Sequence, residues 1–146
     1  MSARSDDTVQ ILLDLSRLLR NLTRLVGGAD DGPAMTATTR VALVELGDSG
    51  PIRLNDLATR MGVSAPTASR SVDALHELGL VERVVDPNDR RAVRIELSAQ
   101  GKAKLEERKA RASVAFAPAV AVLSESDRRQ LSDLLRRMTE ALSDGG

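Results

Sequence analysis

The stretch from Leu54 to Ser98 constrains the fold most, because it carries the signals for two short helices followed by a β-hairpin. In its first nine residues, LNDLATRMG, apolar residues recur at the spacing of one helix face, and Gly62 can adopt the left-handed backbone of a sharp turn. Ser64 is a natural N-cap for a second helix, and Pro66 falls in the first turn of that helix, where no N–H is needed. The order helix, turn, helix is typical of a helix-turn-helix unit.

The second helix has one apolar face and one polar face. Its apolar stripe is Ala68, Val72 and Leu75, so at about 100° per residue most of the intervening residues point outward. The outward residues are small or carry hydroxyls, with one arginine, as suits a helix that contacts phosphates and base edges in a DNA major groove. A solvent-exposed helix rich in Ser and Thr would show the same pattern. The candidate DNA-binding residues are Ser64, Pro66, Thr67, Ser69 and Arg70.

A predicted hairpin follows this helix. Leu80–Val85 and Ala92–Leu97 are β-rich runs in which polar and apolar residues largely alternate, and the loop between them reads DPNDRR. A hairpin that packs after a recognition helix is a wing, and an arginine at its tip can enter a DNA minor groove. We expect Asp89, two residues before Arg91, to hold a guanidinium by a charge-assisted pair. The candidate DNA-binding residues of the wing are Asp89, Arg90 and Arg91.

The order helix, helix, two strands, with DPNDRR in the turn and SAQGK opening the next helix, resembles the MarR family of bacterial transcription regulators over nearly the whole chain. The family's wing motif carries over to Asp86, Asp89 and Arg91, while Arg90 occupies a variable, usually basic position. The resemblance implies a homodimeric winged helix-turn-helix protein that binds a near-palindromic double-stranded operator. It further implies a protein that usually represses and that often releases the operator when a small molecule binds.

Amphipathic helices are predicted at both ends of the chain. In Thr8–Val26 five apolar residues are spaced four, three, four and three apart, which is a heptad seam, and further leucines widen it. The segment 124–143 carries a similar stripe, and Pro118 should kink or break the helix that precedes it. A two-fold dimer would bury both faces economically. The core helix of a monomer is the alternative interpretation of the first segment.

Together these elements predict a mainly α fold with a small β wing, in which a winged helix-turn-helix domain is flanked by N- and C-terminal helices that form a dimerisation region. We place the N-terminal dimerisation helix and its loop at residues 1–35. The winged helix-turn-helix DNA-binding domain follows at 36–98, where Thr36 caps a supporting helix, and the C-terminal dimerisation helices occupy 99–146.

Composition excludes several other functions. The chain has no cysteine, one histidine and no phosphate-binding glycine loop or nucleophile motif, so we expect no enzyme, no metal and no cofactor. The start, MSARSDD, is not a signal peptide, and the longest uncharged run, 112–124, is shorter than the roughly 20 apolar residues that span a bilayer. We expect a cytoplasmic protein without membrane contact.

The charge balance bears on the kind of DNA binding. Twenty-one basic and 21 acidic residues give a net charge of zero, which argues against a sequence-indifferent DNA-binding protein. A winged helix that acts as a protein-interaction module is the other alternative. We favour specific double-stranded DNA, because the hydroxyl-rich face and the wing-tip arginines together are what groove and base readout require.

By the resemblance, an effector pocket would lie between the dimer helices and the DNA-binding lobe. Arginines there could meet an anionic or aromatic small molecule, although ordinary surface charges would look the same in the sequence. The candidate ligand-binding residues are Arg17, Arg20, Arg40 and Phe116.

Overall fold

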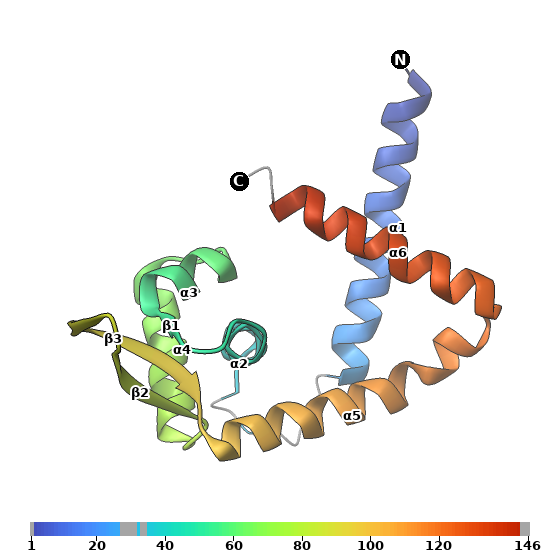
Figure 1. Cartoon of the computed structure of the whole chain (residues 1–146). Coiled ribbons are helices and arrows are strands. Elements are labelled where there is room, and N and C mark those ends of the chain that lie inside the picture. The colour runs from blue at the N-terminus through green and yellow to red at the C-terminus, as the bar shows by residue number, and fades with distance from the viewer. Residues whose placement is uncertain (1, 27–31, 33–34, 144–146) are drawn as a thin grey trace. The chain divides into compact units, whose positions relative to one another are not determined.

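The computed structural model describes residues 2–26, 32 and 35–143, and the chain forms two compact units (Figure 1). The winged-helix unit is Gly27–Ala110, and the helical unit combines Met1–Val26 with Arg111–Gly146. The predicted loop at 27–33 lies outside the described residues except for Gly32.

The winged-helix unit contains the predicted helix-turn-helix and hairpin. Its helices are α2 (Ala37–Ser49), α3 (Leu54–Met61), α4 (Ala65–Glu77) and the first half of α5 (Ala99–Ala121). Its strands are β1 (Ile52–Arg53), β2 (Val81–Asp86) and β3 (Asp89–Leu97), which form one antiparallel sheet in the order β1-β3-β2. The mainly helical architecture with a small β wing confirms the predicted fold class.

Local capping explains where the helices begin and end. The Thr36 hydroxyl accepts the N–H of Thr39 at 3.2 Å and starts α2, and the Ser64 hydroxyl accepts the N–H of Thr67 at 3.3 Å and starts α4. Gly62 ends α3 with a left-handed φ of 66°, a conformation that a residue with a Cβ adopts only at a cost. These three predictions are confirmed.

The core of the unit lies where α2, α3 and α4 meet the sheet. Leu43 and Leu46 of α2, Leu57 of α3 and Leu75 of α4 are at most 1% exposed. The predicted stripe of α4 is also buried, so the opposite face of that helix is left toward solvent. Burial of the stripe therefore fixes which residues α4 can present to a partner.

The first half of α5 packs tightly on this unit. A Cβ built at Gly101 would lie 1.9 Å from the Leu80 carbonyl oxygen, so only glycine allows the approach, and Leu105 is 4% exposed. Ser98 caps the helix, as expected, by accepting the N–H of Gly101 at 3.0 Å. The compact unit thus extends to Ala110.

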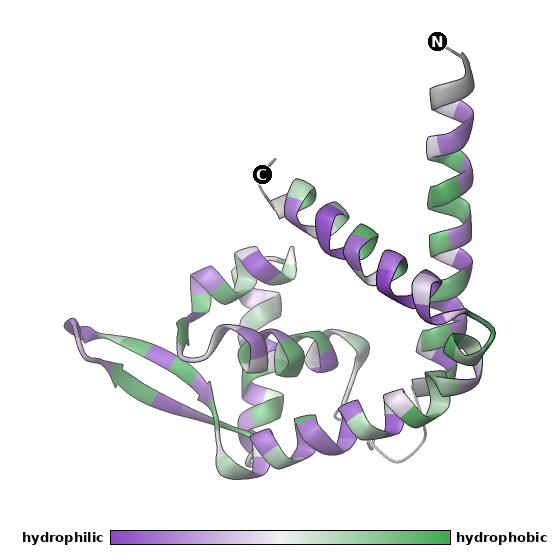
Figure 2. Cartoon of the chain, turned by 45° about the vertical axis from the view of Figure 1, so that its right-hand side comes forward, coloured by the Kyte–Doolittle hydropathy of each residue, from purple (hydrophilic) through white to green (hydrophobic). Residues whose placement is uncertain are grey.

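The helical unit contains α1 (Ser2–Val26), the second half of α5 and α6 (Glu125–Ser143). Apolar side chains are exposed along both α1 and α6. The green bands on these helices in Figure 2 mark hydrophobic residues. Of the kink or break predicted at Pro118, the break does not occur, because α5 continues to Ala121. A proline removes only one hydrogen bond, and the helix retains the others. No helix among the described residues is long and apolar enough to span a membrane.

A buried carboxylate joins the three strands at the wing. Asp86, at the end of β2, is 0% exposed and lies 2.8 Å from the nearest Arg53 guanidinium nitrogen and 3.1 Å from Nε of Arg94. It also accepts the backbone N–H of Asn88 at 2.9 Å. The Asn88 N–H and the two guanidinium groups lower the pKa of Asp86 to about 2, against the opposing effect of burial.

The charge of Asp86 should make stability depend on pH. The folded-state pKa lies below the unfolded value of about 3.9, so the stabilisation is complete above about pH 4 and is lost as the pH falls toward 2. We expect Asp86→Asn to lower Tm at pH 6 by roughly 5 °C or more, and the difference from the wild type to shrink between pH 4 and 2.5. Thermal unfolding at a series of pH values measures both effects.

Asp48→Asn is the matched control, since Asp48 is an exposed carboxylate at the end of α2. It should change Tm little at any of these pH values. A Tm deficit of Asp86→Asn that stays constant from pH 6 to pH 2.5 would contradict the role given to the Asp86 charge.

Candidate nucleic-acid interface

The five residues predicted to bind DNA from the recognition helix lie at its N-terminal end, and none of them is buried. The hydroxyl oxygens of Ser64 and Thr67 are 2.9 Å apart and cap α4. Arg70 is exposed, and within the described part of the chain no carboxylate lies within 4.0 Å of its guanidinium. This end of α4 therefore presents short polar groups and one unpaired positive charge to solvent.

An acid on the same helix is bound by a basic partner. Asp73, one turn beyond Arg70, forms an ion pair with Arg83 of β2. The pair links α4 to the wing and offsets a negative charge that would otherwise repel a nearby phosphate. The sequence reasoning did not predict this contact, because the two residues belong to different elements.

The wing is a longer and tighter hairpin than we predicted. The turn consists of Pro87 and Asn88 alone, and β3 begins at Asp89, so Arg90 and Arg91 lie on the strand beside the turn rather than in a loop. Both arginines are exposed, and among the described residues neither guanidinium has a carboxylate partner. They are the basic residues nearest the tip.

Asp89 pairs with a guanidinium, as expected, and the partner is Arg53, whose guanidinium lies 3.8 Å from one Asp89 carboxylate oxygen. The other oxygen accepts the backbone N–H of Arg91 at 3.0 Å. A short Asp side chain reaches the amide two residues on more easily than it reaches the end of a long arginine. Asp89 therefore fixes the backbone of Arg91 and leaves its guanidinium unpaired.

Arg53 and Arg94 are the functional residues that the sequence reasoning missed. They are direct partners in the β1–β3 register, and both bind Asp86. The hydrogen bond to Asp86 raises the pKa of Arg53. Little in the sequence indicates the contact between Arg53 and Asp86, because the two residues are 33 positions apart. Through Asp86 the two arginines link β1 to the hairpin that carries Arg90 and Arg91.

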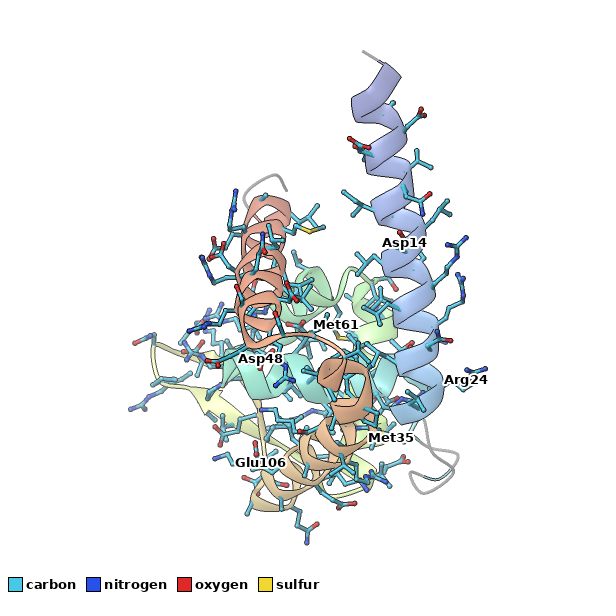
Figure 3. All side chains as sticks on the ribbon, turned by 90° about the vertical axis from the view of Figure 1, so that its right-hand side faces the viewer. Asp14, Arg24, Met35, Asp48, Met61 and Glu106 are labelled. Atoms are coloured by element: carbon cyan, nitrogen blue, oxygen red, sulfur yellow. The ribbon has the colours of Figure 1, made fainter. Side chains whose placement is uncertain are left out.

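The four predicted ligand-binding residues do not share one environment. Arg17 forms an ion pair with Asp14 at 3.1 Å on α1, whose side chains project outward in Figure 3. Arg40 donates to the Met35 carbonyl oxygen at 2.7 Å and so supports the start of α2. Phe116 lines a groove of about 320 Å³ in the helical unit together with Val120 and Arg128, and the lining includes none of the three predicted arginines. Arg20 is exposed on α1.

Among the described residues, no group of three or more His, Asp or Glu side chains is placed to hold a metal ion. The polar groups that converge are those of α4 and the wing, and they are suited to contacts with a nucleic acid.

Comparison with known proteins gives matches to transcriptional regulators. The MarR family model matches residues 35–93. The curated relative YsmB of Bacillus subtilis, an uncharacterized HTH-type transcriptional regulator, is 35% identical over 74 residues, which are about half of either chain (51%).

Solved structures match over most of the chain. A probable transcriptional regulator from Pseudomonas aeruginosa is 34% identical with a TM-score of 0.67, and the match covers 88% of this chain and 96% of that one. A MarR family protein from Bacillus stearothermophilus is 26% identical with a TM-score of 0.78, and the match covers 94% of this chain and 97% of that one. Since the family model, these structures and the winged-helix geometry agree, the chain belongs to the MarR family of DNA-binding transcriptional regulators.

Proposed function

We propose that this protein binds a near-palindromic double-stranded operator as a homodimer and reads its sequence. The observation that carries the proposal is the presence of two DNA-facing candidate surfaces in one compact unit. The N-terminal end of α4 exposes hydroxyls and the unpaired Arg70, and the wing exposes Arg90 and Arg91 on a hairpin that Asp86 fixes. A helix in the major groove and a wing in the adjacent minor groove would use both surfaces at once.

The side chains divide between base readout and positioning. Arg70 has the planar donor pair that binds guanine, while Ser64, Thr67 and Ser69 are suited to phosphates and base edges, and Pro66 to an apolar contact. On the wing, Arg90 and Arg91 would enter the negative potential of the minor groove. Asp89 would act through the Arg91 backbone that it holds.

The exposed apolar faces of the helical unit support a homodimer. On α1, Leu12 and Leu19 are 61% and 53% exposed in the single chain, and on α6 Leu134 and Leu142 are 43% and 81% exposed. Apolar surface of this extent marks an interface. A two-fold dimer would place two α4 helices about one DNA turn apart, roughly 34 to 36 Å, as a palindromic operator requires.

Repression with release by a small molecule completes the proposal. The solved structure of BpsR from Bordetella bronchiseptica concerns regulation of its DNA binding by 6-hydroxynicotinic acid; it is 26% identical, with a TM-score of 0.65, over 86% of this chain and 89% of that one. By analogy, we propose that an anionic or aromatic small molecule regulates the DNA binding of this protein. The groove beside Phe116 is one candidate place, because it offers an aromatic ring with Arg128, and Arg17, Arg20 and Arg40 remain proposed contacts.

Binding to selected DNA tests the function. The full-length protein would select duplexes from a random pool, and the selected duplex and a scrambled one would then be titrated at about 150 mM salt. We expect nanomolar affinity for the selected duplex, two protomers per site, and at least about 1000-fold weaker binding to the scrambled one. Equal affinities would favour a sequence-indifferent protein, and no binding to any duplex would favour a protein-interaction module.

Arg91→Ala tests the wing. Loss of a minor-groove contact should weaken operator binding by about 1 to 3 kcal/mol and leave the fold intact, because the Arg91 side chain makes no ion pair with the described residues. Fluorescence anisotropy measures the affinity, and thermal unfolding checks the fold. Arg24→Ala, which removes the same charge from the end of α1, is the control and should bind nearly normally. Unchanged affinity of Arg91→Ala would remove the wing from the interface.

Leu18→Glu tests the dimer. A charge on the apolar face of α1 should split the dimer and abolish operator binding together, since a single recognition helix covers only one half-site. Sedimentation velocity measures the association state. Asn21→Glu, a charge at a polar position of the same helix, should remain dimeric. A dimeric Leu18→Glu protein would show that this face of α1 is not the interface.

A further inference from the structure

A hydroxyl-lined pocket lies between the start of α2 and one face of α4. Its volume is about 260 Å³, and its lining contains no carboxylate. Most of the lining residues carry a hydroxyl, and one carries a positive charge. The lining residues are Thr36, Thr38, Thr39, Thr67, Arg70, Ser71 and Ala74.

The start of α2 supplies free hydrogen-bond donors at this pocket. The N–H groups of Ala37 and Thr38 belong to the first turn, where no preceding helical carbonyl is available. The next two amides are already satisfied, because those of Thr39 and Arg40 donate to the Thr36 hydroxyl and carbonyl oxygens. The helix dipole adds partial positive charge at the same place, which favours an anion.

Ser71 gives an independent sign that the pocket takes a ligand. Its side chain lines the pocket and is only 5% exposed, yet its hydroxyl has no hydrogen-bond partner among the described residues. Every fully enclosed polar side-chain atom of those residues does have a partner, so the Ser71 hydroxyl opens into the pocket. A buried donor without a partner costs stability unless a ligand or water satisfies it.

The charge around the pocket favours an anion. Arg70 is at the lining and has no carboxylate partner within the described ranges. The nearest acid along α4, Asp73, is bound to Arg83 of the wing. The pocket therefore combines amide and hydroxyl donors with one available guanidinium, a set that matches the oxygens of a phosphate group.

We propose that the pocket seats a backbone phosphate of the operator, one in each half-site. The inference rests on the proposed operator binding and adds a contact to it. Thr67 and Arg70 belong both to this pocket and to the α4 face proposed for the major groove, so a DNA strand along that groove passes the pocket. A phosphate held between α2 and α4 would set the depth and register of α4 without reading a base.

Two substitutions remove the donors without removing charge. Ser71→Ala and Thr38→Val each delete one hydroxyl that has no other partner among the described residues, so the fold should be kept, and unfolding midpoints check this. Ser49→Ala is the control, because it deletes a hydroxyl at the opposite end of α2. We expect the Ser71→Ala/Thr38→Val protein to bind the selected and the scrambled duplex about 10-fold more weakly, and the control to bind normally.

Neutral methylphosphonates in the selected duplex identify the phosphate. With the wild type, one position in each half-site should lose about 10-fold in affinity when its phosphate is neutralised. With the double variant, the loss at that position should disappear while losses at other positions remain. Equal losses for both proteins at every position, or normal affinity of the double variant, would overturn the proposal.

Two further measurements distinguish this proposal from binding of a free anion and from a failure of operator binding itself. Calorimetric titration of the wild type with inorganic phosphate, without DNA, should show no binding tighter than about 1 mM. Tighter binding that Ser71→Ala abolishes would make the pocket a site for a free anion and overturn the operator assignment. If the wild type does not distinguish the selected duplex from the scrambled one, operator binding itself fails and this proposal fails with it, before any variant is compared.

Discussion

The buried Asp86 carboxylate is the interaction on which the shape of the wing depends. A charge without solvent is stable only if partners replace its hydration, and Asp86 has them from three directions: Arg53 on β1, Arg94 on β3 and the Asn88 amide in the turn. Loss of any one partner would leave the buried negative charge of Asp86 poorly compensated. The contacts of Asp86 with Arg53 and Arg94 therefore join the two-residue strand β1 and the hairpin into one sheet. The pairing of β1 with β3 is very short by itself.

One face of helix α4 packs against the core, and the opposite face presents polar residues to solvent. Ala68, Val72 and Leu75 are at most 1% exposed and hold α4 against α2 and α3, so the outward residues are free of any packing role. Ser71 departs from this division, because it is buried on the side toward α2 and polar. The Ser71 hydroxyl opens into the pocket beside α2, where the proposed operator phosphate would give it a hydrogen-bond partner.

The sequence predicts the local features well because their causes are local. Thr36, Ser64 and Gly62 act within one turn of chain, and the α4 stripe follows from helical periodicity alone. The contacts that the sequence did not predict mostly join different elements of the chain. The partners of Asp86, the Asp73–Arg83 pair and the fit of Gly101 against Leu80 all depend on tertiary packing that no motif encodes. The place of Arg90 and Arg91 on β3 was missed because turn residues Pro87 and Asn88 suffice to reverse the chain.

With a net charge of zero, the affinity of the proposed homodimer for its operator would depend on shape and on two-fold symmetry. With little long-range attraction to DNA, a single winged-helix unit has only its short-range contacts, and these cover one half-site. In the proposed homodimer, a second unit held by the partner chain would make the other half-site an intramolecular contact, so the affinities would multiply. The apolar faces of α1 and α6 would thus determine operator affinity as strongly as α4 does. Any effector that changes the spacing of the two units would then release DNA without touching a DNA-binding residue.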